Sequence, residues 1–159
     1  MSPTAARDVS VDRAGLLDFV RPRHRGILVT TRRDGGPQLS PVTMGVDSAG
    51  DIVVSTYPER AKTRNARRDP RASMCVLSEA FNGDWVQVDG AITLVDQPGA
   101  VEELVEYFRC ISGEHPDWDE YREAMRRQEK VLLRLRIERW GPISRGGFPA
   151  RLLAPADEG

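Results

Sequence analysis

The 159-residue sequence is poor in the residues that most often carry catalysis or bind metals. It has only two histidines, His24 and His115, and two cysteines, Cys75 and Cys110, and no spacing among them resembles a set of metal ligands. Neither histidine lies beside a nucleophile motif. The sequence therefore predicts no metal centre and no nucleophilic catalysis, and an enzyme without its own acid, base or nucleophile usually takes its chemistry from a cofactor.

Long apolar runs are also absent. No stretch approaches the length of a membrane span, and the first residues lack the apolar core of a signal peptide, so we expect a cytoplasmic protein with no membrane partner. The formal net charge of −1 argues against general affinity for nucleic acid, which needs many contacts to phosphates. No Gly-x-Gly-x-x-Gly motif follows a strand-like run, which argues against a dinucleotide-binding Rossmann site.

What the sequence does contain is typical of one globular domain. Hydrophobic residues make up 40% of it and charged residues 30%, while the aromatic content of 6% predicts a mainly aliphatic core. We expect residues 1–10 to be a loose N-terminal arm and residues 141–159, which are rich in Gly and Pro, to be a surface tail. The two cysteines are expected to be buried free thiols.

Alternating apolar and polar residues predict a mainly β fold. The cleanest alternation is Leu133, Leu135 and Ile137 against Arg134 and Arg136. The six predicted strands are residues 27–31, 38–46, 52–56, 72–77, 85–95 and 131–140. Helices are predicted over residues 11–20, with Asp12 as a candidate N-cap, from Pro58 through the basic segment, and over 98–110 and 118–128. The Asp34-Gly35 pair predicts a hairpin turn between the first two strands. Short strands with inserted rather than alternating helices favour a six-stranded antiparallel β-barrel in a single domain.

The segment from Tyr57 to Arg71 is the strongest functional signal. It holds six basic and two acidic residues in a chain of nearly zero net charge, so its charge is local. It follows a strand and contains Pro58, a residue favoured at the first helical position. A helix N-terminus beside cations is suited to binding a phosphate. Of the 23 basic residues only Lys62 and Lys130 are lysines, and Lys62 lies inside this segment.

Three neighbouring features together predict a cofactor site. Ser40-Pro41-Val42-Thr43 lies on a strand, where Pro41 removes a hydrogen-bond donor and so belongs at an edge or a bulge, leaving backbone groups free for a flat ligand. Ser55-Thr56 ends the next strand with two hydroxyls, and Arg60 and Lys62 follow as an anion clamp. The alternative is that Arg60, Arg64, Arg67 and Arg71 form a solvated helix face, which we expect at least for the outer arginines Arg67, Arg68 and Arg71.

These segments resemble a known family. The most specific are residues 34–40, 60–65, 68–73 and 113–122, of which the last, Gly-Glu-His-Pro-Asp-Trp-Asp-Glu-Tyr-Arg, is the most diagnostic. From residue 27 to about 140 the chain resembles the FMN-binding split β-barrel proteins of the pyridoxine 5′-phosphate oxidase-like superfamily. Within that superfamily it is similar to the actinobacterial F420-dependent oxidoreductases.

The resemblance implies a homodimer with two cofactor sites at the subunit interface. It implies that Gln38, Ser40 and Val42 lie along the cofactor ring and ribityl chain, that Ser55 and Thr56 hydrogen-bond near the phosphate, and that the run Arg60-Ala61-Lys62-Thr63 clamps it. Asn65 matches the motif and either joins the site or braces the helix. Trp85 either reaches the site from the second subunit or fills the interface. Pro41 departs from the pattern, because related proteins can carry a polar residue there.

We expect F420 as the cofactor, with FMN as the alternative. FMN ends in a compact dianionic phosphate, whereas F420 carries a phosphodiester and a polyglutamate tail that the outer arginines could meet. The expected reaction is hydride transfer between the deazaflavin and a small conjugated acceptor, with no proton donor identified. Open alternatives are an FMN-dependent oxidase or reductase, a non-catalytic F420 carrier, a pyridoxal-phosphate or haem-handling relative, and, least favoured, nucleic-acid binding.

Overall fold

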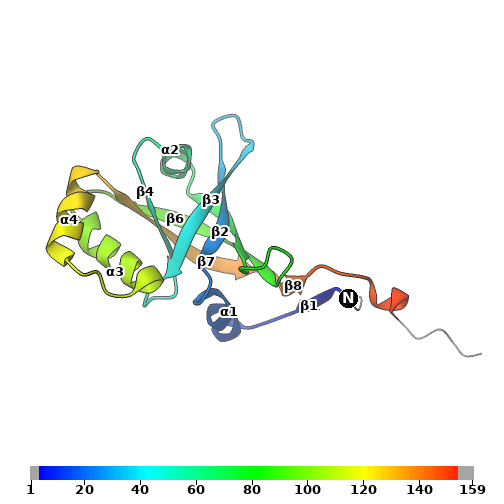
Figure 1. Cartoon of the computed structure of the whole chain (residues 1–159). Coiled ribbons are helices and arrows are strands. Elements are labelled where there is room, and N and C mark those ends of the chain that lie inside the picture. Colours follow the sequence, from blue (N-terminus) through cyan, green and yellow to red (C-terminus); the bar gives the residue numbers. More distant parts are fainter. Residues whose placement is uncertain (1–3, 154–159) are drawn as a thin grey trace, which may run out of the picture.

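Six antiparallel strands close into a barrel (Figure 1), as the computed structural model of the chain, which describes residues 4–153, shows. The strands are β2 (Arg25–Thr31), β3 (Pro37–Val46), β4 (Ile52–Thr56), β5 (Arg71–Leu77), β6 (Trp85–Val95) and β7 (Val131–Trp140). Their order is β6-β5-β2-β3-β4-β7, and pairing of β6 with β7 closes the ring. The predicted mainly β, six-stranded antiparallel barrel is confirmed.

Two short strands extend the sheet beyond the barrel. Strand β1 (Arg7–Val9) pairs with β8 (Ile143–Arg145), and β8 touches β6 through the pair Ser144 and Trp85. Asp84 holds both strands, because it accepts hydrogen bonds from Arg7 at 3.0 Å and Arg145 at 2.8 Å. The N-terminal arm is therefore not loose over Arg7–Val9, and the tail contains β8 and the 3₁₀ turn η1 (Ala150–Leu152). Three-residue strands carry too little periodicity to be predicted.

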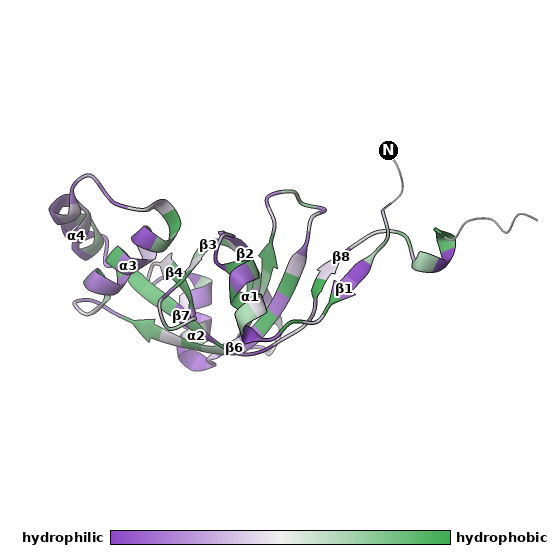
Figure 2. Ribbon diagram, turned by 90° about the horizontal axis from the view of Figure 1, so that it is seen from below, coloured by the Kyte–Doolittle hydropathy of each residue, from purple (hydrophilic) through white to green (hydrophobic). Residues whose placement is uncertain are grey.

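The barrel interior is aliphatic, as the low aromatic content predicts. Hydrophobic and hydrophilic residues interleave along the strands (Figure 2), and the inward set includes Leu28, Met44 and Leu133, all fully buried. Helix α1 (Arg13–Val20) closes one end by burying Leu16 and Val20. Its predicted N-cap is confirmed, because Asp12 accepts from the Gly15 backbone N–H at 2.9 Å.

A β-bulge at Glu138 in β7 brings the backbones of β6 and β7 unusually close. The register between β6 and β7 shifts between Asp89 and Gly90. A Cβ atom at Gly90 would collide with the carbonyl oxygen of Arg136 on β7. The barrel therefore requires glycine at this position, for steric reasons and not for a left-handed backbone.

The remaining helices lie outside the barrel. Helix α2 (Ala61–Arg68) covers one opening, whereas α3 (Ala100–Ser112) and α4 (Trp118–Arg127) pack together beside β4 and β7 (Figure 1). Helix α2 begins three residues later than predicted, because the Arg60 N–H bonds to the Tyr57 carbonyl and makes Pro58 part of a turn. No helix in residues 4–153 has the length and apolar character needed to cross a membrane.

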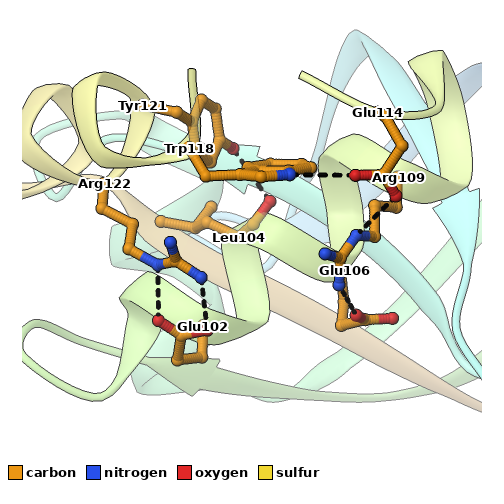
Figure 3. A network of polar contacts seen from close by, with 8 residues as sticks. All are labelled: Glu102, Leu104, Glu106, Arg109, Glu114, Trp118, Tyr121 and Arg122. Carbon is orange, nitrogen blue, oxygen red and sulfur yellow. Dashed lines mark hydrogen bonds and ion pairs between the residues drawn. The ribbon is translucent and has the colours of Figure 1, made fainter. Parts of the chain in front are cut away.

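Polar contacts fasten α4 onto α3 (Figure 3). The Tyr121 hydroxyl donates to the Leu104 carbonyl at 2.8 Å inside a second core that also contains Val105 and Met125. Trp118 Nε1 donates to Glu114 at 2.9 Å. Segment 113–122, the most specific part of the family resemblance, thus connects α3 to α4 and packs the two helices together. Within it, His115 packs against Phe108 and Trp118.

Candidate cofactor site

The barrel is split along one edge of β3. This strand pairs with β2 along Pro37–Thr43, but it pairs with β4 only through Met44, Gly45 and Val46. Consecutive residues of an antiparallel strand point their backbone groups to opposite sides. The Thr43 carbonyl accepts from the Tyr107 hydroxyl at 3.0 Å, away from β2, so the nitrogen of Pro41 also faces this free side. Pro41 lies at an edge, as predicted, and costs no ladder hydrogen bond there.

A pocket of about 410 Å³ opens at this free edge. One wall comes from β3, β4 and α2, and the other from α3, α4 and the turn that follows α4. It is lined by Pro41, Val42, Thr43, Val54, Ser55, Lys62, Tyr107, Phe108, Tyr121, Met125, Gln128 and Lys130. The structure thus brings together five predicted site residues, namely Pro41, Val42, Thr43, Ser55 and Lys62. The sequence patterns did not predict the second wall, because the apolar residues of its helices have the spacing of ordinary core-facing stripes.

The pocket is positively charged and has no acidic counter-charge. Its lining includes Lys62 and Lys130 but no Asp or Glu. Lys62 is half-buried, and burial lowers the pKa of its amine, with the positive charges of Arg60 and Lys130 lowering it further. An anionic ligand would reverse this effect and stabilise the charged amine. The electrostatics of the pocket therefore favour an anion.

The N-terminus of α2 also favours an anionic ligand. Arg60 is its N-cap residue, but no side chain caps the helix and no acidic residue lies in its first turn. Within residues 4–153, the backbone N–H groups of Ala61 and Lys62 donate to no acceptor. Uncapped N–H groups and the helix dipole attract negative charge. Together with the amine of Lys62 and the hydroxyl of Ser55, they form a donor set suited to a phosphate group.

The inward row of β3 runs beside the pocket. Gln38, Ser40 and Val42 share one face of the strand, because side chains alternate along it. The Ser40 hydroxyl is buried and has no hydrogen-bond partner within the described residues. An unpartnered buried hydroxyl costs free energy until a partner is supplied. Gln38 instead accepts from the Thr30 hydroxyl at 3.2 Å, so its side chain is already engaged within the barrel.

Two predicted phosphate ligands have other partners. Thr56 and Thr63 are buried, and their hydroxyls lie 3.1 Å apart. Thr63 donates to the Tyr57 carbonyl at 2.7 Å, so it accepts from Thr56. These bonds brace the turn before α2, and neither side chain lines the pocket. The structure therefore assigns both hydroxyls to positioning the helix, in contrast to the predicted direct contact.

Asn65 also braces α2, the second of the two roles considered for it. It is buried, donates to the Thr30 hydroxyl at 3.1 Å and accepts from Arg68 at 2.9 Å. The outer arginines Arg67, Arg68 and Arg71 are exposed, as predicted, but Arg71 lies on β5 and not on the helix face. Arg67 pairs with Asp96, and Arg71 pairs with Asp69 at 2.7 Å. Arg71 holds the pKa of Asp69 at about 2.

Trp85 lies away from the pocket of its own chain. It pairs with Leu77 on β5, Leu77 pairs with Arg25 on β2, and Arg25 pairs with Thr43 on β3. Three strand spacings thus separate Trp85 from the pocket, and its side chain is 38% exposed. A contribution of Trp85 to the site of a second subunit stays a prediction.

The histidines take structural positions. His115 Nδ1 accepts from the Asp117 backbone N–H at 2.9 Å, and His24 Nδ1 lies 2.8 Å from the Met44 carbonyl. Neither lines the pocket. In the part of the chain that the structure describes, no three His, Cys, Asp or Glu side chains come together as a metal site.

Comparison with known proteins agrees with this architecture. The structure is similar to the conserved hypothetical protein Rv2991 from Mycobacterium tuberculosis, with 23% identity, a TM-score of 0.69 and coverage of 100% of this chain and 96% of that one. An F420 reductase is 18% identical with a TM-score of 0.60, over 77% of this chain and 93% of that one. The haem storage protein HutZ from Vibrio cholerae is 17% identical with a TM-score of 0.61, over 82% and 93%.

Such low identities show the fold alone, and the solved structures that share it carry names of different functions. The family assignment comes from the sequence itself. Residues 14–144, most of the chain, match the family described as pyridoxamine 5′-phosphate oxidase. The match spans α1, the six strands of the barrel and the helices that enclose the pocket. The chain therefore belongs to the pyridoxamine 5′-phosphate oxidase family.

Proposed function

We propose that the protein is an F420-dependent oxidoreductase that transfers a hydride between the reduced deazaflavin and a small conjugated acceptor. The observation that carries the proposal is the half-buried amine of Lys62, which stands without an acidic partner at the uncapped N-terminus of α2. This arrangement lies directly beside the free edge of β3. A phosphate-bearing, flat cofactor matches both features.

The residues present fit such a cofactor. Its phosphate would be held by Lys62, Arg60, the Ser55 hydroxyl and the free N–H groups of α2. Its ring would lie along the free edge of β3 beside Pro41 and Val42, close to the unpartnered hydroxyl of Ser40. F420, when bound, supplies two-electron hydride chemistry.

The protein's own part is to bind, orient and exclude water. Val54, Phe108 and Met125 give the pocket apolar surface. Burial raises the pKa of Tyr107 and of Tyr121, so both hydroxyls stay protonated near neutral pH and neither is a base. The site therefore favours chemistry that needs no side-chain base.

Each alternative function differs from the proposed one in one feature. An FMN-dependent oxidase or reductase would use the same anion clamp for a compact dianionic phosphate. A carrier would bind F420 without transferring a hydride. Haem handling is less favoured, because neither histidine lines the pocket. We retain the homodimer in the proposal, with interfacial sites, since Leu39 on the outer face of β3 is 57% exposed beside the pocket wall.

Tryptophan-fluorescence titration with F420 and, separately, with FMN tests the proposal. We expect tighter binding of F420, and a loss of about tenfold or more in Lys62→Ala. Arg64→Ala is the matched control, because Arg64 is an exposed cation on the same helix. An acceptor panel with reduced F420 then separates enzyme from carrier. Preference for FMN would support the FMN alternative, and binding of neither cofactor would overturn the proposal.

A further inference from the structure

The only two lysines of the chain line the same pocket. Lys62 lies in the first turn of α2, and Lys130 follows α4, far away in the sequence. The chain has 23 basic residues in total, so the other cations are all arginines. Compact ammonium groups thus occur only where the tertiary structure builds this cavity.

The backbone places Lys130 there by a specific turn. Glu129 adopts a left-handed conformation with φ of 55°, which ends α4 and reverses the chain. The Lys130 N–H then bonds to the Met125 carbonyl at 3.1 Å, and its carbonyl accepts from Gln97 at 3.0 Å. A non-glycine residue in this conformation costs free energy. The structure therefore holds Lys130 in place at the expense of local strain.

Nothing acidic neutralises the two amines. Neither Lys62 nor Lys130 takes part in an ion pair of the described residues, whereas Arg67, Arg71 and Arg122 do. Lys130 Nζ lies 3.9 Å from the centroid of the Tyr57 ring, a cation–π contact that orients it without cancelling its charge. The charge of Lys130 contributes to the lowered pKa of Lys62. Two positive charges without an acidic partner in one cavity favour the binding of an anion.

We propose that Lys130 forms a second anion site, adjacent to the phosphate site of Lys62 and the N-terminus of α2, so that the pocket selects a ligand with two negatively charged groups. Gln128, which lines the same wall, supplies a neutral hydrogen-bonding amide. Lys62 and Lys130 spread the positive charge across the pocket, and Arg60 lies outside its lining but near enough to lower the pKa of Lys62. A ligand with a single compact anion leaves Lys130 unmatched.

The inference deepens the proposed function and rests on it for the identity of the cofactor, but the anion site itself can be tested without any cofactor. Calorimetric titrations with inorganic phosphate and with pyrophosphate, at equal ionic strength and pH, compare one phosphate group with two linked ones. The variants are Lys130→Gln, the rescue variant Lys130→Arg, and Arg127→Gln. Arg127 is the matched control, an exposed cation at the end of α4 that does not line the pocket.

In the wild type we expect pyrophosphate to bind about tenfold more tightly than phosphate. Lys130→Gln should remove most of this preference while phosphate affinity changes by less than about twofold. Lys130→Arg should restore it in part, and Arg127→Gln should keep it. Equal losses for both anions in Lys130→Gln, or no preference in the wild type, would overturn the inference.

Parallel F420 titrations distinguish this failure from failure of the proposed function. If pyrophosphate preference depends on Lys130 but neither F420 nor FMN binds, the second anion site stands and the oxidoreductase proposal fails. If F420 binds wild type and Lys130→Gln equally well and pyrophosphate shows no preference, the cofactor proposal stands and the second anion site fails.

Discussion

The side-chain amide of Asn65 on α2 donates to the hydroxyl of Thr30 on β2 at 3.1 Å. Thr30 in turn donates to Gln38 on β3 at 3.2 Å. Both Asn65 and Thr30 are buried. This chain of hydrogen bonds fixes the basic helix onto β2 and β3, and so positions the cations of α2 beside the split.

Replacing Asn65 should therefore loosen the helix that carries the anion clamp. We expect Asn65→Ala to lower the free energy of unfolding by about 2 kcal/mol, because it removes a buried hydrogen-bond donor. Urea denaturation measures the change. Arg64→Ala, on the exposed face of α2, should stay within about 0.5 kcal/mol. A double-mutant cycle with Thr30→Val should give a coupling of about 1 kcal/mol, and additive effects would show that the bond contributes no stability.

Gly90 should be irreplaceable. In Gly90→Ala the new methyl group meets the Arg136 carbonyl oxygen across the bulge between β6 and β7, and backbone atoms there have little room to move. We expect a loss of about 3 kcal/mol or more. Gly141→Ala is the control, because a Cβ at Gly141 meets nothing within 4 Å. Equal melting temperatures of the two variants would contradict the assignment of the bulge.

The turn at Glu129 should gain stability from glycine. With φ of 55°, Glu129 occupies a conformation in which glycine avoids the steric cost of a side chain. We expect Glu129→Gly to raise the free energy of unfolding by up to about 1 kcal/mol and Glu129→Val to lower it. Thermal unfolding of the three proteins gives the order. A wild type that is more stable than both would show that the Glu129 side chain makes a contact outweighing the strain.

Tyr121 should make the fold sensitive to alkali. Burial raises the pKa of its hydroxyl from 10.0 to about 12. The unfolded chain then releases this proton at lower pH than the folded one, so the stabilising contribution is complete below pH 10 and is lost as pH rises through about 12. Tyr121→Phe should cost about 1 kcal/mol at neutral pH, because the bond to the Leu104 carbonyl is lost.

The same variant should show a weaker decline in stability above pH 10, which denaturation at a series of pH values measures. Burial also raises the pKa of Tyr107, which is unchanged in this variant. The decline in stability above pH 10 should therefore become smaller without disappearing. A decline identical to that of the wild type would show that Tyr121 ionises in the same range in both states. Arg122→Gln is a useful comparison, since it removes only a surface ion pair with Glu102 and should leave the decline above pH 10 unchanged.

The sequence by itself determined the parts of this protein that depend on local pattern. Alternation of side chains predicted the six barrel strands, and Asp12 marked the start of α1. Gly35, with φ of 86°, turns the hairpin between β2 and β3 as the Asp-Gly pair indicated. Pro41 marked the free edge, and the basic segment marked the helix beside it. Each of these signals acts over a few residues, so it can be read without the fold.

The tertiary structure alone decided what surrounds that edge. Lys130, Tyr107 and Phe108 join the pocket because α3 and α4 pack beside β4. The spacing of Tyr107 and Phe108 on α3, and the place of Lys130 after α4, gave no hint of a ligand. The hydroxyls of Thr56 and Thr63 bond to each other and neither side chain lines the pocket, because the end of β4 and the first turn of α2 lie next to each other. Pairing across long stretches of chain is set by the burial of whole faces, which no short segment encodes.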